Sequence, residues 1–487
     1  MTIKLKLLGA VALVGAFAAT PASAEWANSL GMGQKTSNIG GAGVASASDY
    51  DVFYTNPAGA ANITRPTIGV GVRVLSTKGL ENSEPGFNHD VSETVKGSDW
   101  GYLPSVGAYM PGLLPNVVLG VGFGSPFALA GNWSNGSGFT TGAEGRSGFN
   151  GEGFDQVEVL TAELSPTVGI KLSDKLNVGV SVNFTTLKHV FLAIDLNGGL
   201  VAPGISTRLT AQTPDDLGLP IPPWEFATSP HEATFTVGAQ YQMLPNVAIG
   251  AVYREETPTE YDLNLRLHLT GERNTATAKI EIPRHLQVGV SVDVTPALKL
   301  SADVKWTNWA NAVGVGSPLV VNIGPGGLLG GAAQRLIANH AADDTYSFHL
   351  GGQYKVLPNL ELQAGYTYDP EVFDTPNKSF LAYSSNRHIF SAGATLELAD
   401  AALLGTNGDW EFTLGGQFVH YEDFDVAAGQ SSTFGLTGSG AIAANPATLP
   451  TVNFTQNTSS FSGGGYVWTA GLSAVYKFGA PEELALK

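Results

Sequence analysis

Apolar and polar residues alternate with a period of two along many segments of this chain. In 176–184, 286–294 and 298–307 every second residue is apolar, and the residues between them are mostly small or polar. A period of two is the pattern of a β-strand that presents one apolar face. These segments therefore predict strands, and the question becomes what kind of sheet the strands form.

Fourteen candidate strands can be counted between residues 66 and 478. They are centred on Val70, Val106, Val121, Val168, Val180, Val237, Tyr253, Val288, Ala302, Leu350, Ala364, Ala394, Leu414 and Leu472. An even number of strands, each about 10 residues or longer and with aromatic residues near the ends, is typical of a bacterial outer-membrane barrel. The aromatic residues in question are Trp100, Trp306, Trp309, Trp410 and Trp468.

The connections between these candidate strands alternate in length. Turns such as MPGLLPN, LSDKLN, QMLPN, DVTPALK and KVLPN are short, and LADAALLGTNGD is somewhat longer. The other connections are mostly long and rich in Gly, Pro, Asn and Ser: 77–99, 126–156, 195–230, 259–275, 310–343, 370–384 and 425–464. Short turns at one end and long loops at the other favour a 14-stranded antiparallel transmembrane β-barrel with both chain ends on the periplasmic side.

Composition and charge exclude several function classes. The chain of 487 residues contains no Cys, which removes a disulfide framework, a Cys-ligated zinc site and a thiol nucleophile. Its formal net charge of -17, without a cluster of Lys and Arg, argues against nucleic acid as a partner. We expect no cofactor and no metal.

The chain begins with the pattern of a secretory signal peptide. Lys4 and Lys6 precede an apolar stretch, and Ala22-Ser23-Ala24 forms a cleavage site. We therefore assign 1–24 to a signal peptide, 25–65 to a segment before the first strand, 66–478 to the barrel and 479–487 to a C-terminal periplasmic extension. No later stretch reaches the roughly 18 consecutive apolar residues of a membrane helix.

The segment 25–65 is expected to fill the lumen as a hatch. It is rich in small residues and lacks a strand pattern. Within it, Asn56 is a good helix N-cap, Pro57 suits the first helical position and Ala58 can continue the helix. An ordinary turn before the first strand is the alternative.

Several motifs in order resemble the long-chain fatty acid and hydrocarbon transporters of the bacterial outer membrane, the FadL/TodX-like (OMPP1) family. GGAGVASASDYDVFYTNPAG resembles the hatch signature of that family, and GVGFGSPFAL resembles the end of its third strand. IPRHLQVGVSVDVTPALKLSADVKWTNW, LELQAGYTYDPEVF and NRHIFSAGATLEL resemble later paired strands.

The resemblance implies a luminal hatch and passive uptake of hydrophobic molecules. Substrate would be captured among extracellular loops, move to an internal apolar pocket and leave sideways at a kinked third strand. Gly120, Gly122 and Gly124 weaken strand packing and Pro126 lacks a backbone donor, so this strand is a plausible lateral opening. Alternatively, Pro126 simply begins the loop.

Two groups of residues are candidates for substrate binding. The first consists of apolar loop residues, which bind substrate or pack together as a lid: Phe127, Leu129, Trp133, Trp224 and Phe226. The second consists of Arg254 and Lys305, which fall on the expected inward face. They would meet a fatty-acid carboxylate, or else form ion pairs with Asp303 or a hatch carboxylate.

Two other functions were weighed against this transport hypothesis. A general porin for polar solutes predicts an open, charged lumen without a plug. A barrel-embedded lipid hydrolase lacks any linear motif here, and His349 is its best candidate residue. We therefore expect a monomeric, non-enzymatic protein of the bacterial outer membrane. Its partners would be a hydrophobic small molecule, outer-membrane lipid and lipopolysaccharide, and the outer-membrane assembly machinery.

Overall fold

The structure is a computed structural model of the chain, and it describes most of the barrel and the hatch. The described residues are 32–85, 92–96, 100–132, 154–197, 206–214, 225–226, 233–267, 273–314, 316, 319–323, 334–338, 341–375, 385–403, 406–427, 430 and 461–479. The predicted signal peptide (1–24) and nearly all of the predicted C-terminal extension (479–487) lie outside these residues and remain predictions.

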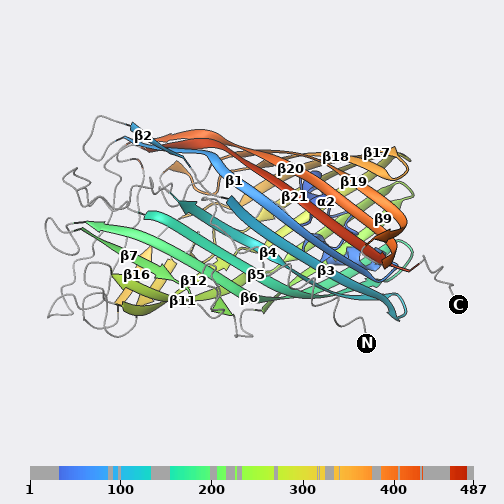
Figure 1. Cartoon of the computed structure of the whole chain (residues 1–487), viewed down its shortest axis with the longest axis horizontal. Coiled ribbons are helices and arrows are strands. Elements are labelled where there is room, and N and C mark those ends of the chain that lie inside the picture. Colours follow the sequence, from blue (N-terminus) through green and yellow to red (C-terminus); the bar gives the residue numbers. More distant parts are fainter. Residues whose placement is uncertain are drawn as a thin grey trace.

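Fourteen long strands pair with their neighbours in sequence and close into a barrel (Figure 1). They are β1 Thr67–Pro85, β3 Trp100–Leu114, β4 Val117–Asn132, β5 Phe154–Lys171, β6 Leu176–Asn197, β9 Ala233–Leu244, β10 Val247–Arg254, β13 His285–Thr295, β14 Leu298–Thr307, β17 Thr345–Leu357, β18 Leu360–Asp369, β19 Arg387–Leu403, β20 Thr406–Val426 and β21 Phe461–Phe478. The pairing of β1 with β21, from Thr67 opposite Lys477 upward, closes the ring. All pairs are antiparallel, so the predicted 14-stranded antiparallel barrel is confirmed.

The alternation of short and long connections is also present. Short turns such as 115–116, 245–246 and 358–359 lie at the end of the barrel where β1 begins and β21 ends. The 12-residue turn read from LADAALLGTNGD is corrected, because β19 continues to Leu403 and β20 begins at Thr406. Both strands are longer than the apolar alternation predicts, because the backbone pairing between β19 and β20 continues to Leu403 opposite Thr406.

The long connections are not purely loops, which corrects the sequence interpretation. They contain shorter strands that extend the wall at the other end: β2 Ser92–Lys96, β7 Ser206–Gln212, β8 Glu225–Phe226, β11 Thr257–Leu267, β12 Arg273–Ile282, β15 Leu319–Ile323 and β16 Gln334–Ala338. Strand β7 pairs with β6 and β11, and β12 pairs with β11 and β15. Through β7, the β11–β12 hairpin joins the same sheet as the wall strands, at the end of the barrel opposite the short turns (Figure 1).

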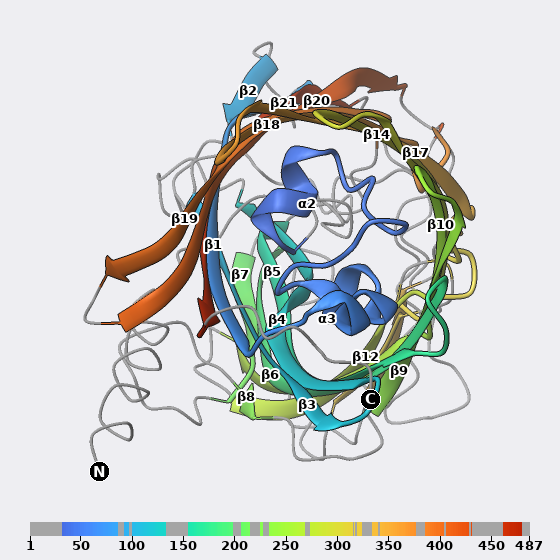
Figure 2. The same cartoon turned by 90° about the vertical axis from the view of Figure 1, so that its right-hand side faces the viewer.

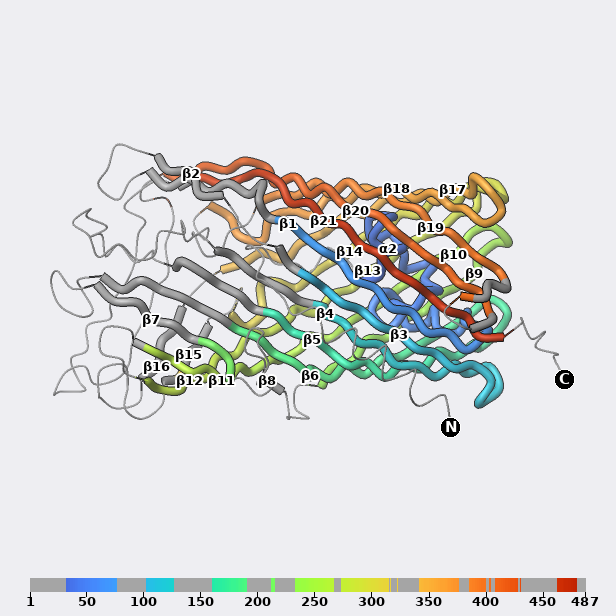
Figure 3. Tube along the Cα trace, viewed as in Figure 1, coloured from blue at the N-terminus to red at the C-terminus, as the bar shows by residue number. Residues whose placement is uncertain are grey.

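Residues 32–63 lie inside the ring of strands, and we call them the hatch (Figure 2). They form α2 Gln34–Asn38, α3 Val52–Thr55 and the 3-10 helix η1 Pro57–Asn62. None of the helices in the described part of the chain is long and apolar enough to span a membrane. Figure 3 shows the hatch close to the short-turn end, next to the start of β1.

The lipid-facing and lumen-facing sides of the wall differ in chemistry. Outward side chains are large, apolar and exposed, for example Leu414 and Trp468. Inward side chains are mostly buried Ser, Thr and Gln, together with glycines where the hatch lies. This arrangement follows from the period of two, because successive residues of a strand point to opposite faces.

Candidate functional site

The helix start predicted at Asn56-Pro57 is present. Helix η1 begins at Pro57, and Oδ1 of Asn56 accepts a hydrogen bond from the Ala58 amide at 3.1 Å. The amide Nδ2 of Asn56 donates to the Val44 carbonyl at 2.8 Å and to the Ala239 carbonyl of β9 at 3.2 Å. Asn56 is completely buried, so this side chain both caps a helix and attaches the hatch to the wall.

The hatch is seated against the wall through glycines. On every wall strand except β13 and β14, a described inward glycine lies so close that an added Cβ would fall within 3.0 Å of a hatch atom. These glycines are Gly69, Gly71, Gly107, Gly122, Gly124, Gly169, Gly179, Gly238, Gly250, Gly351, Gly365, Gly393, Gly415 and Gly471, and we call them the glycine belt. The belt lets hatch and wall backbones approach where any side chain would separate them.

The glycines predicted to mark the lateral opening have a more specific environment. The Phe53 ring lies where a Cβ on Gly122 would be, and the Met32 sulfur occupies the same position for Gly124. Gly120 lies instead against the Tyr109 ring of the neighbouring strand. Two of the three glycines therefore make room for the hatch, in addition to any effect on strand packing.

The ladder between β3 and β4 stops partway along both strands. Their pairing runs from Leu114 opposite Val117 to Ser105 opposite Gly124 and is not continued, although β3 extends to Trp100 and β4 to Asn132. The β4–β5 register shifts between Gly124 and Phe127, on either side of Pro126. A proline cannot donate to a ladder. We call this interruption the β3–β4 gap.

An apolar cluster lies on the inner wall beside the β3–β4 gap. Leu75, Ile389, Val419, Tyr421 and Val467 are buried and in contact, and Leu103 and Phe424 pack against them. Leu103 belongs to the part of β3 that lacks a β4 partner. We call these seven residues the luminal apolar cluster.

Charged groups of the lumen are paired across the barrel. Arg254 Nη2 lies 2.6 Å from each carboxylate oxygen of Glu163, and each side chain is only 2% exposed. The guanidinium also lies 5.8 Å from the ring centroid of Tyr54 in α3. The ion pair that the sequence analysis gives as the alternative role of Arg254 is therefore present. Its partner is Glu163 of β5, and not Asp303 or a hatch carboxylate.

The other predicted luminal base, Lys305, is buried on β14 among charged neighbours. The charges of Asp369, Arg387 and Arg254 act on it, and Arg387 forms a buried ion pair with Asp369. Asp303, two residues earlier, instead accepts hydrogen bonds from the Val44 amide at 3.0 Å and from Gln287 at 2.9 Å. Asp303 therefore contacts the hatch backbone, and a substrate role for Lys305 or Arg254 remains a prediction.

His349, the best hydrolase candidate, contacts the hatch. Its Nδ1 lies 2.7 Å from the Gly40 carbonyl oxygen and 3.3 Å from Thr367 Oγ1. The described residues show no cluster of three or more His, Asp or Glu that could hold a metal ion. His349 therefore lies on the inner face of β17, where it contacts the hatch.

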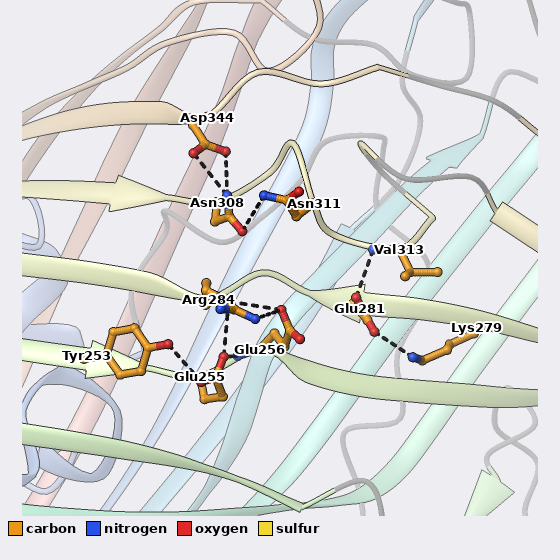
Figure 4. Close-up of polar contacts among 10 residues, drawn as sticks. All are labelled: Tyr253, Glu255, Glu256, Lys279, Glu281, Arg284, Asn308, Asn311, Val313 and Asp344. Atoms are coloured by element: carbon orange, nitrogen blue, oxygen red, sulfur yellow. Dashed lines mark hydrogen bonds and ion pairs between the residues drawn. The ribbon is translucent and has the colours of Figure 1, made fainter.

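The base of the β11–β12 hairpin is held by a polar network (Figure 4). Arg284, between β12 and β13, lies 2.5 Å from Glu256 and 3.2 Å from Glu255, which connect β10 to β11. Tyr253 donates to Glu255 at 2.9 Å. The connection from β10 to β11 and the connection from β12 to β13 are therefore bonded to each other.

Asp344 belongs to the same region and has a structural role. Its carboxylate accepts hydrogen bonds from Trp306 at 3.1 Å, from Asn308 at 2.9 Å and from the Ala310 amide at 3.1 Å. Figure 4 shows Asp344 over Asn308 at the end of β14. This acid fixes the chain after β14.

The predicted loop residues are described only in part. The backbones of Phe127 and Leu129 belong to β4 and that of Phe226 to β8, whereas Trp133 and Trp224 lie outside the described residues. Capture of substrate by these side chains stays a prediction. The luminal apolar cluster was missed, although consecutive apolar residues such as Ile389-Phe390 and Val467-Trp468 signal it, since one residue of each pair must face inward.

A buried carboxyl makes docking of the hatch depend on pH. The pKa of Asp49 is raised to about 7, first because the group is buried and then because Glu411 and Asp51 are close; Lys35 acts in the opposite direction. The contribution of Asp49 to docking is therefore fully present below the ordinary carboxyl pKa of about 4, and it is lost as the pH rises to about 7.

We expect more leakage of a small polar dye from vesicles at about pH 8.5 than at about pH 5. Asp49→Asn, which cannot ionise, should remove most of this difference. An equally steep pH dependence in the variant would show that another group is responsible.

Residues 15–404 match a protein family described as outer membrane protein transport protein (OMPP1/FadL/TodX). A comparison with curated proteins finds no match.

Solved structures share the fold at low sequence identity. A Pseudomonas aeruginosa FadL homologue is 13% identical with a TM-score of 0.69, covering 94% of this chain and 100% of its own. The Ralstonia pickettii toluene transporter TbuX is 16% identical with a TM-score of 0.60, covering 93% and 100%. The P. putida toluene transporter TodX is 16% identical with a TM-score of 0.59, with the same coverage.

Proposed function

The chain belongs to the OMPP1/FadL/TodX family of outer-membrane transport proteins, and from this premise we propose that it takes up hydrophobic small molecules passively and releases them sideways into the membrane. It is a channel of the outer membrane and not an enzyme. Long-chain fatty acids and hydrocarbons are the substrate classes under this proposal, and toluene is named for two of the similar structures.

The observation that carries the proposal is the position of the luminal apolar cluster at the β3–β4 gap. Leu103 belongs both to the cluster and to the unpaired part of β3. A hydrophobic molecule on the cluster is therefore next to the point where the β3–β4 ladder ends although both strands continue. Lateral exit keeps such a molecule out of water, which favours this route over one through the periplasmic end.

A general porin for polar solutes is supported less well. A porin needs a continuous polar channel, whereas the hatch lies in this lumen in contact with glycines of almost every wall strand. The hatch also buries apolar groups against β3 and β4, including Val52 and Ala60 against Tyr109 and Val118. These contacts favour a plugged barrel from which molecules leave sideways through the wall.

Transport is tested by the initial rate of uptake of an alkylbenzene and of oleate in cells with and without the protein. The substrate that enters faster with the protein defines the class. Uptake of both at the same rate without the protein would refute the proposal.

The role of the luminal apolar cluster is tested by Val419→Thr, which places a hydroxyl at an apolar contact without changing its shape. Burial of such a group costs about 1–3 kcal/mol in proteins, so we expect about tenfold weaker uptake at limiting substrate. Val475→Thr is the control, because Val475 is equally buried on an inward position of β21 but outside the cluster. Equal loss in both variants would contradict the assignment.

A further inference from the structure

Four buried polar atoms on neighbouring strands have no hydrogen-bond partner among the residues that the structure describes. They are Asn183 Oδ1 and Thr185 Oγ1 of β6, Thr234 Oγ1 of β9 and Thr259 Oγ1 of β11. Each of these residues is at most 6% exposed. Buried polar groups in proteins are nearly always hydrogen-bonded, because an unpaired one destabilises the fold. Four of them in one place therefore indicate a site that something else completes.

Three of these residues are neighbours in the β6–β9 ladder. Asn183 lies directly opposite Thr234, and Thr185 is two residues beyond Asn183, so its side chain points to the same face of the sheet. That face is the lumen, because Gly179, four residues before Asn183, lies against Pro57 of the hatch. The three polar groups therefore face the lumen together.

Thr259 approaches the same place from β11. Glu163 of β5 lies opposite Thr185 in the β5–β6 ladder, and its carboxylate accepts a hydrogen bond from Thr257 at 3.4 Å. Thr259 is two residues after Thr257 and lies on the same face of β11. We call the four residues with unpaired atoms the hydroxyl site: Asn183, Thr185, Thr234 and Thr259.

The course of the strands explains why these atoms lack partners. Strand β6 pairs with β9 as far as Phe184 and with β8 from Leu187. Strand β11 pairs with β7 from Asn264 onward, so in the described part of the chain its residues 257–263 have a ladder on the β12 side alone. The hydroxyl site thus lies where neighbouring strands diverge, and fewer protein groups are within reach of its side chains.

The groups of the hydroxyl site fit a ligand that both donates and accepts a hydrogen bond. A threonine hydroxyl can do either, and the Asn183 oxygen only accepts. The Nε atom of Arg254, which also lacks a partner among the described residues, only donates. The charge of Arg254 is compensated by Glu163. An ionised head group would therefore be buried without compensation, whereas a neutral hydroxyl adds no charge.

We propose that the hydroxyl site binds the hydroxyl group of a neutral hydrophobic alcohol or phenol. This inference rests on the proposed uptake of hydrophobic molecules and names a substrate class within it. A hydrocarbon of the same length leaves the hydroxyls of the site unpaired. A carboxylate is repelled by Glu163 and by the Asn183 oxygen. Uncharged oxygenated compounds are therefore bound in preference to both.

The site is tested by binding of radiolabelled 1-decanol, decane and decanoate to the purified protein in lipid vesicles, with protein-free vesicles as the blank. Thr234→Val and Thr259→Val each remove one hydroxyl with little change of shape. Each should weaken 1-decanol binding about fivefold, for one hydrogen bond, and leave decane binding unchanged. Unchanged 1-decanol binding in both variants would overturn the site, and tighter binding of decanoate than of 1-decanol would overturn its preference for a neutral ligand.

Thermal stability separates a ligand site from a purely structural role. Removing an unpaired buried hydroxyl should not lower the temperature at which the ligand-free barrel loses its compact gel mobility. Thr167→Val is the matched control, because the Thr167 hydroxyl on β5 is buried but donates to the Ser165 carbonyl at 3.0 Å and lies 2.8 Å from Ser181 Oγ. This variant should lower that temperature and leave 1-decanol binding unchanged. An equal fall in Thr234→Val would show that its hydroxyl is structural, against the proposal.

Uptake by cells separates the hydroxyl site from the proposed function. If 1-decanol binds as expected but no hydrophobic molecule enters faster with the protein, the site stands and the proposed function fails. If an alkylbenzene or oleate is taken up but the threonine variants bind 1-decanol as the unchanged protein does, the proposed function stands and the hydroxyl site fails.

Discussion

Replacing Gly351 by valine is expected to displace the hatch and open the lumen to small polar solutes. An added Cβ at Gly351 would lie 2.6 Å from the Ile39 carbonyl oxygen and 2.8 Å from the Ile39 Cβ. Neither atom can rotate away, because one belongs to the backbone and the other is attached to it. Overpacking of this kind typically costs about 1–3 kcal/mol, and occasionally more. The leak rate of a polar dye from vesicles measures the result.

The neighbouring glycine provides the control for this prediction. Gly352 points to the lipid side, where an added Cβ would meet only Leu300, at 3.4 Å. Gly352→Val should therefore leave both dye leakage and the heat-resistant gel mobility of the barrel unchanged. Equal leakage from the two variants would mean that strand disruption, and not the hatch, is responsible.

Arg254→Met is expected to destabilise the barrel by about 3–5 kcal/mol, because it leaves the Glu163 carboxylate buried without its partner. Both side chains are 2% exposed, so water cannot replace the lost contact. The temperature at which the barrel loses its compact gel mobility should fall. It should recover in Arg254→Met with Glu163→Leu, since replacing a buried ion pair with apolar residues is often neutral or stabilising.

The double variant, Arg254→Met with Glu163→Leu, also tests whether Arg254 recognises the substrate. A double variant that is stable but takes up oleate more slowly than an alkylbenzene would give Arg254 a role toward the carboxylate. Equal uptake of both substrates would confine Arg254 to an ion pair that holds β5 and β10 together across the lumen. A double variant as unstable as Arg254→Met would contradict the electrostatic explanation.

The wall strands could be predicted from the sequence because each one repeats a local signal. A period of two and a short turn are both properties of neighbouring residues, and all fourteen predicted centres lie in wall strands. The additional strands carry the same signal. In β11 the residues Tyr261, Leu263 and Leu265 alternate with polar residues, but the sequence analysis places 259–275 in a long connection.

The site could be predicted only where it coincides with a local motif. The Asn56 cap depends on residues two positions apart, and the break near Pro126 follows from a missing donor. By contrast, Arg254 and Glu163 are 91 residues apart on strands that are not adjacent. The interaction of Gly122 with Phe53 likewise depends on where the hatch lies, so Gly122 was read as a weakness of the strand.

The attachment of α2 to the last strands has a consequence for assembly of the barrel. The first strand, β1, must find β21 across almost the whole chain, and closing a loop of that length costs about 5 kcal/mol in chain entropy. The hatch directly precedes β1, yet Lys35 and Asn38 bind β20 and β18. Once these contacts form, the beginning of the chain is tethered beside its end. We therefore expect the plug to bring the two edges of the unfinished sheet together during folding, so that wall closure is a short-range event.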